Sequence, residues 1–171
     1  MSTALQNRKA ALPHALLLTL GLAATVGSAL GFEHIGGYIP CALCLLERLP
    51  YYYAIPVAGL AALSAALNGP AWLTRGLLVI VGIMMLVGAG MGVYHAGAEW
   101  GFWEGPSTCA TSAQGVTQNA GDLLGDLDGK MPPSCTEASL RVLGLSFAGW
   151  NVIASLFFAA IAFAGVRARK V

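Results

Sequence analysis

The chain has 171 residues, of which 57% are hydrophobic and only 10% are charged. Because a soluble domain carries about 25% charged residues, this composition excludes an ordinary soluble domain and indicates a membrane protein. The formal net charge of +1 gives no electrostatic reason to expect a nucleic-acid partner.

Four long segments contain no Asp, Glu, Lys or Arg. They are residues 10–32, 49–74, 76–98 and 142–166, which hold 23, 26, 23 and 25 residues. A membrane-spanning helix needs about 20 predominantly apolar residues, and unbroken apolar runs do not fit the alternating strands of a β-barrel. We therefore predict one integral membrane domain over 1–171, all-α, with four spans. The expected spans are about 11–32, 45–67, 72–97 and 143–166.

The first span follows Arg8 and Lys9, as a signal peptide would. Its apolar stretch is longer than the roughly 7–15 residues of a signal core, so we expect a permanent anchor. The sequence NGPAW at 68–72 predicts a tight turn. Short links make neighbouring helices antiparallel, which favours an up-down four-helix bundle. Gly88, Gly90 and Gly92 are expected to let helices approach closely.

The charges divide between the two ends of this bundle. One side carries six basic and no acidic residues, namely Arg8, Lys9, Arg75, Arg167, Arg169 and Lys170. The opposite side, residues 33–48 and 99–141, holds all eight acidic residues and three basic ones. Its two loops are predicted at about 33–44 and 98–142. By the positive-inside rule, both termini are expected to be cytoplasmic and both loops to face the outside.

All four cysteines fall in the outer loops. Cys41 and Cys44 lie in the first loop, and Cys109 and Cys135 lie in the second. Thiols in an oxidising compartment favour disulfides, and no second pair stands at metal-ligand spacing, so we predict no metal. Each pair has a structural alternative, because a disulfide can simply stabilise a loop. Two pairs on one membrane face instead favour a relay by thiol–disulfide exchange.

The sequence IPCALCLLERL at 39–49 places a CxxC pair at the beginning of the second span. A helix N-terminus favours a thiolate. Arg48 stands four residues after Cys44 and shares its helix face, whereas Glu47 points elsewhere and leaves Arg48 free. We expect Arg48 to keep Cys44 ionised or to polarise an acceptor beside it. The alternative is a flanking arginine that only reaches the membrane surface.

A relay needs a final electron acceptor, and the sequence contains no flavin fingerprint, haem motif or metal cluster. Because the CxxC pair lies at the lipid boundary, a membrane quinone is the economical choice. His95, about one turn inside the third span, is expected to bind a quinone carbonyl or to pass a proton; an idle interfacial histidine is the alternative. Asn151 is expected near the bilayer midplane, as a hydrogen-bonding residue between helices.

Together these residues resemble the DsbB family of bacterial inner-membrane, quinone-dependent thiol oxidases. The resemblance covers nearly the whole chain and includes CALCLLER at the second span, the outer cysteine pair and LGLSFAGWN at the fourth. It implies that Cys41 and Cys44 exchange electrons with ubiquinone or menaquinone, with Cys44 in contact with the quinone. Arg48 would support that contact, and His95 would lie on the quinone side.

The resemblance also implies a partner, a DsbA-like thioredoxin-fold oxidase of the periplasm. Cys109 would form a mixed disulfide with that partner, and Cys135 would then attack Cys41. Since DsbA is a strong oxidant, net electron flow is expected from dithiol to quinone. Two alternatives remain: an enzyme like vitamin K epoxide reductase, whose CxxC pair would come later in the chain, and a non-catalytic scaffold stapled by disulfides.

Overall fold

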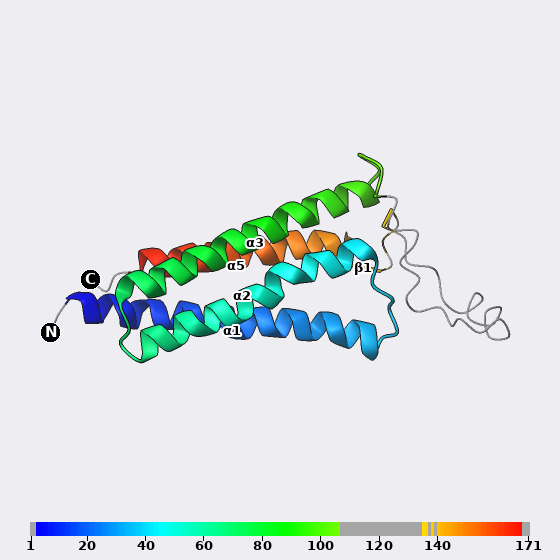
Figure 1. Cartoon of the computed structure of the whole chain (residues 1–171). Helices are drawn as coiled ribbons and strands as arrows, with labels where there is room; N and C mark the ends of the chain where they lie inside the picture. Colours follow the sequence, from blue (N-terminus) through cyan, green and yellow to red (C-terminus); the bar gives the residue numbers. More distant parts are fainter. Residues whose placement is uncertain (1–2, 107–134, 137, 139, 169–171) are drawn as a thin grey trace.

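The computed structural model describes residues 3–106, 135–136, 138 and 140–168. Its four long helices are α1 (Thr3–His34), α2 (Ala42–Ala66), α3 (Ala71–Glu99) and α5 (Phe147–Arg167). Figure 1 shows them running alongside one another in an up-down bundle, with both termini at the same end. Each contains a stretch long and apolar enough to cross a membrane. The predicted all-α bundle of four membrane-spanning helices is therefore confirmed.

The helix α2 begins at Ala42, three residues before the predicted start of the second span. Cys41 is its N-cap: the backbone there is extended, and the Cys41 side chain accepts a hydrogen bond from the Cys44 amide. The N-terminal amides of a helix need such an acceptor. The sulfur of Cys41 supplies it, so the CxxC pair forms the first turn of the helix.

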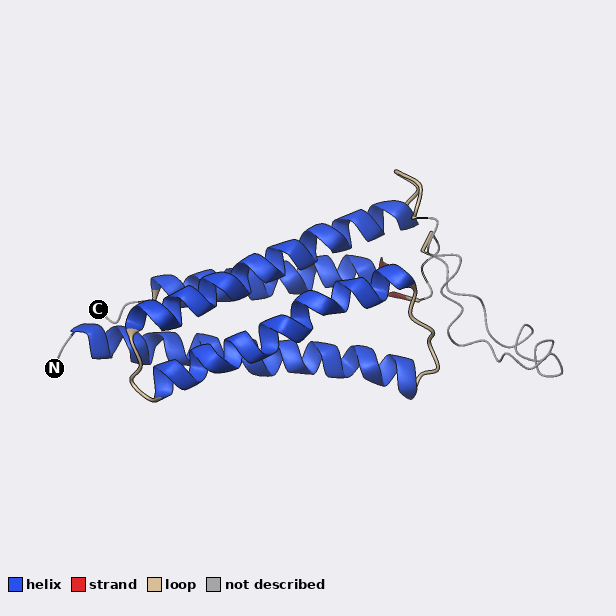
Figure 2. Cartoon of the chain, viewed as in Figure 1, coloured by secondary structure: helices blue, strands red, loops and turns tan. Residues whose placement is uncertain are grey.

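The helix α5 begins four residues later than the predicted span. Residues before it form a small antiparallel hairpin of β1 (Arg141–Val142) and β2 (Leu145–Ser146), visible in Figure 2 at the start of α5. Leu143 and Gly144 both have positive φ, as a two-residue hairpin turn requires. The Ser146 hydroxyl then accepts a hydrogen bond from the Gly149 amide and caps α5.

The predicted turn at 68–72 is also present. Asn68 has a φ of 58°, a conformation that asparagine tolerates better than most residues. The Gly69 amide donates to the Ser64 carbonyl over 2.7 Å, and a Cβ at Gly69 would lie 2.6 Å from the Ser64 hydroxyl. Pro70 then supplies the N-cap of α3. The chain reverses here within a few residues and makes α2 and α3 antiparallel.

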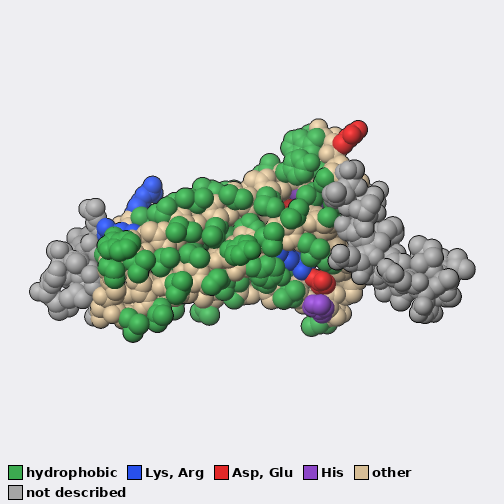
Figure 3. Space-filling model, in the orientation of Figure 1, with side chains coloured by type: hydrophobic (Ala, Val, Ile, Leu, Met, Phe, Trp, Pro, Cys, Tyr) green, Lys and Arg blue, Asp and Glu red, His purple; other side chains and the backbone are tan. Residues whose placement is uncertain are grey.

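Small residues allow the helices to pack closely. A Cβ added at Gly92 of α3 would lie 2.9 Å from Val152 of α5, and one at Gly88 would lie 3.2 Å from the Ser155 hydroxyl. Gly90 has no neighbour within 4 Å, so the prediction is right for two of these glycines and wrong for the third. The outer surface is apolar between the two ends, as Figure 3 shows for one face. Such a surface suits a lipid environment.

Candidate thiol redox site

The two cysteines of the CxxC pair are free thiols in contact. Their sulfur atoms lie 2.8 Å apart, because positions three apart at a helix N-terminus face the same way. The hydrogen bond from Cys44, together with one from His95, outweighs burial and lowers the pKa of Cys41 to about 4. Cys41 is therefore the better-stabilised thiolate here, whereas we expected the thiolate on Cys44. The role of Cys44 toward a quinone concerns another state of the pair and stays a prediction.

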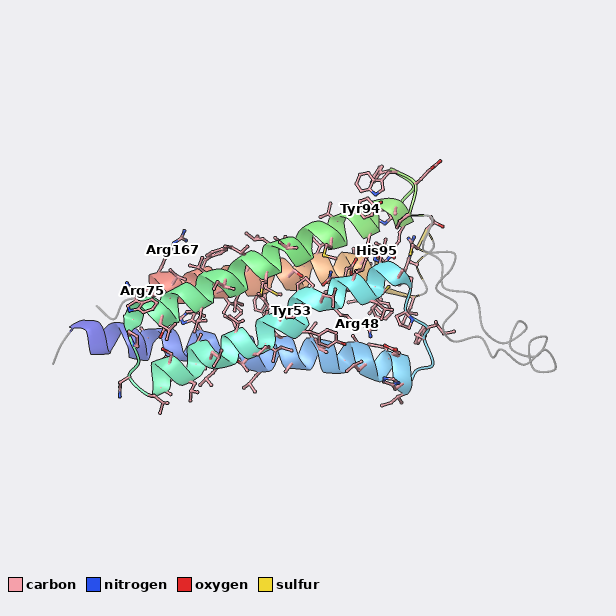
Figure 4. The ribbon with its side chains drawn as sticks, in the orientation of Figure 1. Arg48, Tyr53, Arg75, Tyr94, His95 and Arg167 are labelled. Carbon is pink, nitrogen blue, oxygen red and sulfur yellow. The ribbon has the colours of Figure 1, made fainter. Side chains whose placement is uncertain are left out.

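His95 connects the CxxC pair to a second buried group. It lies in the last turns of α3, 2% exposed, with Nε2 3.7 Å from the Cys41 sulfur. Its Nδ1 donates to Glu47 Oε1 over 2.8 Å. Glu99, one turn further along α3, approaches Nε2 at 3.8 Å. His95 therefore lies between the sulfur of Cys41 and the carboxylate of Glu47. Figure 4 labels His95 toward the end of the bundle opposite the termini.

The second oxygen of Glu47 is held by Asn151 of α5. Asn151 Nδ2 donates to Glu47 Oε2 over 3.0 Å, while its Oδ1 accepts from the Tyr51 hydroxyl at 2.7 Å. Asn151 links helices as predicted, but its predicted depth is wrong. Because the hairpin delays the beginning of α5 to Phe147, Asn151 lies near the CxxC end of the bundle and not at its middle.

Arg48 is not free, contrary to the prediction. Its guanidinium forms an ion pair with Glu33 of α1. Among the residues that the structure describes, the Glu33 carboxylate is also the hydrogen-bond partner of Arg48. The helix spacing placed Arg48 and Cys44 on one face correctly, and both line the same cavity. The arginine side chain, however, extends toward α1, where a carboxylate neutralises it. Glu47 does point elsewhere, as predicted.

A cavity of about 460 Å³ lies between α1, α2 and α5, and its volume is that of a site for a small organic molecule. Its walls are mostly apolar, and its polar groups gather beside the CxxC pair. The lining residues are Thr25, Val26, Ser28, Ala29, Phe32, Glu33, Tyr38, Ile39, Pro40, Cys44, Glu47, Arg48, Tyr51, Val142, Phe147, Ala148, Trp150, Asn151 and Ala154. Of the residues that the structure describes, Cys41 and His95 do not line this cavity. The two sulfurs therefore face different surroundings.

Cys135 lies beside Cys41. It is disulfide-bonded, 2% exposed, and packs against Cys41 and Leu43. The Cys135 sulfur, the Cys41 sulfur and a ring nitrogen of His95 lie within 4.8 Å of one another. Three such atoms resemble a metal site, but a disulfide sulfur is not the thiolate that a metal prefers. A thiolate close to a disulfide is instead the arrangement of thiol–disulfide exchange. Cys109 lies outside the described residues.

Sequence reasoning did not assign functional roles to Glu47, Glu33 and Tyr51. The signal was available for Glu47, because a carboxylate inside an apolar segment is a functional candidate by default. The partners were not available, since they come from three other segments of the chain. Among the residues that were predicted, the structure brings Cys41, Cys44, Cys135 and His95 together and places Arg48 on the cavity side.

A bundle of membrane-spanning helices with free cysteines beside a disulfide defines a membrane thiol redox protein. The family profile described as "Disulfide bond formation protein DsbB" matches residues 12–165. The chain therefore belongs to the DsbB family, and not to that of the vitamin-K-epoxide-reductase-like alternative. As a member it is a multi-pass membrane protein involved in disulfide bond formation.

Curated relatives agree with this assignment. The "Disulfide bond formation protein B" of Aromatoleum aromaticum is 28% identical over 153 residues, covering 80% of this chain and 82% of that protein. The protein of the same name from Marinobacter nauticus is 30% identical over 150 residues, covering 80% of each. That of an Acidovorax species is 28% identical over 160 residues, covering 87% and 84%. No solved structure matches the chain significantly.

Proposed function

We propose that this protein reoxidises a DsbA-like dithiol oxidase of the periplasm and passes the electrons to a membrane quinone. One observation carries the proposal. Cys41 lies within 4.8 Å of the disulfide-bonded Cys135 and 2.8 Å from Cys44, which lines the cavity. Thiol–disulfide exchange requires direct sulfur–sulfur contact, and these sulfurs form a continuous series from the outer loop to the cavity.

The exchange steps follow from this series. A thiolate of the reduced partner opens the disulfide of the outer loop and forms a mixed disulfide with Cys109. The released Cys135 thiolate attacks Cys41 of an oxidised CxxC pair, and Cys44 leaves as a thiolate facing the cavity. The partner's second thiol then releases the partner in its oxidised form. Cys109 then attacks Cys135, which restores the disulfide of the outer loop and releases Cys41. Cys41 and Cys44 re-form their disulfide when a bound quinone takes up their two electrons. The net result would be the transfer of two electrons and two protons from the partner to the quinone, which becomes quinol.

The cavity suits a quinone ring. A bound quinone supplies a two-electron acceptor, and the chain supplies apolar walls with Cys44 and Arg48 at the polar end. Sites for such molecules are mostly apolar with a few placed polar groups. Either ubiquinone or menaquinone meets these requirements. Because His95 does not line the cavity among the described residues, we assign it to the Cys41 side and not to a quinone carbonyl.

The orientation proposed for this function places the cysteines outside the bacterial inner membrane. Arg75 and Arg167 lie at the end of the bundle that holds both termini, and Arg48 and His95 lie toward the other, as Figure 4 shows. An excess of basic residues marks the cytoplasmic side. The redox site then faces the periplasm, where dithiol proteins are oxidised.

Quinone reduction by purified protein tests this function. Wild type in detergent is mixed with a quinone and a reduced thioredoxin-fold dithiol protein, beside the variants Cys44→Ser, Arg48→Ala and Arg75→Ala. We expect turnover by wild type, none by Cys44→Ser and slower turnover by Arg48→Ala. Arg75 is far from the cavity, so Arg75→Ala should behave as wild type. A wild type inert with ubiquinone and menaquinone would favour the non-catalytic scaffold.

A further inference from the structure

Glu47 contacts His95 and also lines the cavity, and no other carboxylate that the structure describes does both. It is 7% exposed, its Oε1 accepts from His95 at 2.8 Å, and the same side chain lines the cavity between α1, α2 and α5. A buried carboxylate inside an apolar helix is costly and is kept where it carries charge or protons. Glu47 therefore connects the Cys41 side of the site to the cavity side.

The proposed reaction needs such a connection. When two thiols become a disulfide and a quinone becomes quinol, two protons must travel with the two electrons. Cys44 lines the cavity, so its proton has a direct route. Cys41 is 3% exposed and does not line the cavity among the described residues, so the proton that it gives up on becoming a thiolate needs a carrier. The nearest base is His95, whose Nε2 lies 3.7 Å from the Cys41 sulfur.

We propose that His95 and Glu47 carry the proton given up by Cys41 to the quinone cavity, an inference that rests on the proposed function. His95 Nε2 takes up the proton when Cys41 becomes a thiolate, the Nδ1 proton passes to Glu47 Oε1, and Glu47 delivers it to the acceptor in the cavity. In the balanced reaction the Cys41–Cys44 disulfide forms and two electrons reduce the quinone. Its two oxygens receive two protons, one from the Cys44 thiol and one that Cys41 has given up to His95.

The surrounding hydrogen bonds orient this carrier. Asn151 donates to Glu47 Oε2 and is itself held by Tyr51, so Oε1 remains directed at His95. Proton transfer depends on such positions, since donor and acceptor must lie within hydrogen-bond reach. Asn151 and Tyr51 act as positioning residues because they act through Glu47.

One other carboxylate offers a rival route. Among the described residues, the ionisable groups facing His95 are Cys41 before α2, Glu47 of α2 and Glu99 of α3 itself. The sulfur of Cys135 also lies close, but in a disulfide it does not titrate. Glu99 approaches Nε2 at 3.8 Å, and its side chain is 5% exposed. It does not line the cavity among the described residues, so a proton taken by Glu99 would leave toward the outer end of α3. Glu99 is therefore a matched control: a buried carboxylate beside the same imidazole, without access to the cavity.

The test follows the first turnover of fully reduced protein with excess ubiquinone in detergent, in H2O and in D2O. We expect Glu47→Gln to slow quinone reduction by about 100-fold, the order of a lost proton-transfer group, and to raise the solvent isotope effect. Glu99→Gln should stay near the wild-type rate, and Glu47→Asp should recover part of the loss. Quinone affinity, read from quenching of tryptophan fluorescence with Trp150 in the cavity wall, should fall far less than the rate in Glu47→Gln.

Three results would overturn the inference. The first is quinone reduction by Glu47→Gln at the wild-type rate. The second is equal slowing of Glu47→Gln and Glu99→Gln. The third is additive slowing when Glu47→Gln and His95→Gln are combined. Groups on one path are non-additive, so the double variant should be no slower than the slower single one. If Glu47→Gln does not fold, Asn151→Leu is the second variant, because it keeps Glu47 but removes the hydrogen bond from Asn151 to its carboxylate. An inert wild type would instead overturn the proposed function itself.

Discussion

At the scale of single residues, Cys41 occupies the most specialised environment in the site. Its sulfur caps α2, touches Cys44 and faces His95, and these contacts lower its pKa to about 4. A lowered pKa means that the thiolate is present at every pH above that value. Cys41 is therefore ready to act as nucleophile or leaving group at neutral pH.

This environment predicts the pH dependence of alkylation. In reduced protein we expect iodoacetamide to modify Cys41 at nearly the same rate at pH 6 and pH 7, measured by peptide mapping. An ordinary thiol such as glutathione should react about tenfold more slowly at the lower pH, because its pKa is near 8.5. His95→Gln, which removes one of the contacts, should restore part of that dependence. A Cys41 rate that follows glutathione would contradict the prediction.

Local sequence was sufficient for some of these residues and not for others. The spacing CALCLLER correctly placed the CxxC pair at a helix N-terminus and turned Glu47 away from Arg48. It did not reveal that Arg48 meets Glu33 and that Glu47 meets His95. These partners stand 15 and 48 positions away, and only the packing of α1 and α3 against α2 brings them close.

At the scale of elements, the contact between α3 and α5 predicts unequal effects of two neighbouring glycines. Gly92→Ala should lower the stability by about 1–3 kcal/mol, the usual cost of overpacking, because its Cβ would meet Val152 at 2.9 Å. Gly90→Ala meets nothing within 4 Å and should be neutral or stabilising, since alanine favours a helix by about 1 kcal/mol. Thermal unfolding in detergent measures both. Equal melting temperatures for the two variants would show that the helices do not approach as described.

The elements themselves were predictable because hydrophobic length alone identifies membrane-spanning helices. Their ends were less predictable. The cap by Cys41 lengthened α2, and the hairpin at 141–146 shortened the last helix, since both depend on specific backbone hydrogen bonds. The predicted position of Asn151 was wrong for this reason. An apolar run such as VLGLS at 142–146 does not show whether it continues a helix or forms a turn.

At the scale of the whole molecule, the proposed orientation predicts which surfaces meet which compartment. In spheroplasts, a membrane-impermeant maleimide should label Ile35→Cys, a site 90% exposed in the native chain at the CxxC end. Leu67→Cys, 72% exposed at the opposite end, should be labelled only after permeabilisation. The pair is matched in residue type and differs in side. Labelling of Leu67→Cys in intact spheroplasts would reverse the assigned topology.

The gathering of the site at one end of the bundle has an electrical consequence. Cys41, Cys44, Cys135, His95 and Glu47 all lie near the end opposite the termini. In the proposed reaction, electrons and protons then enter from the same side and combine there, so no net charge crosses the bilayer. A reaction that moved one charge across would gain or lose about 2.3 kcal/mol per 100 mV. We expect turnover in proteoliposomes to be indifferent to an imposed potassium diffusion potential: this protein would supply reducing equivalents to the quinone pool without itself generating or consuming membrane voltage.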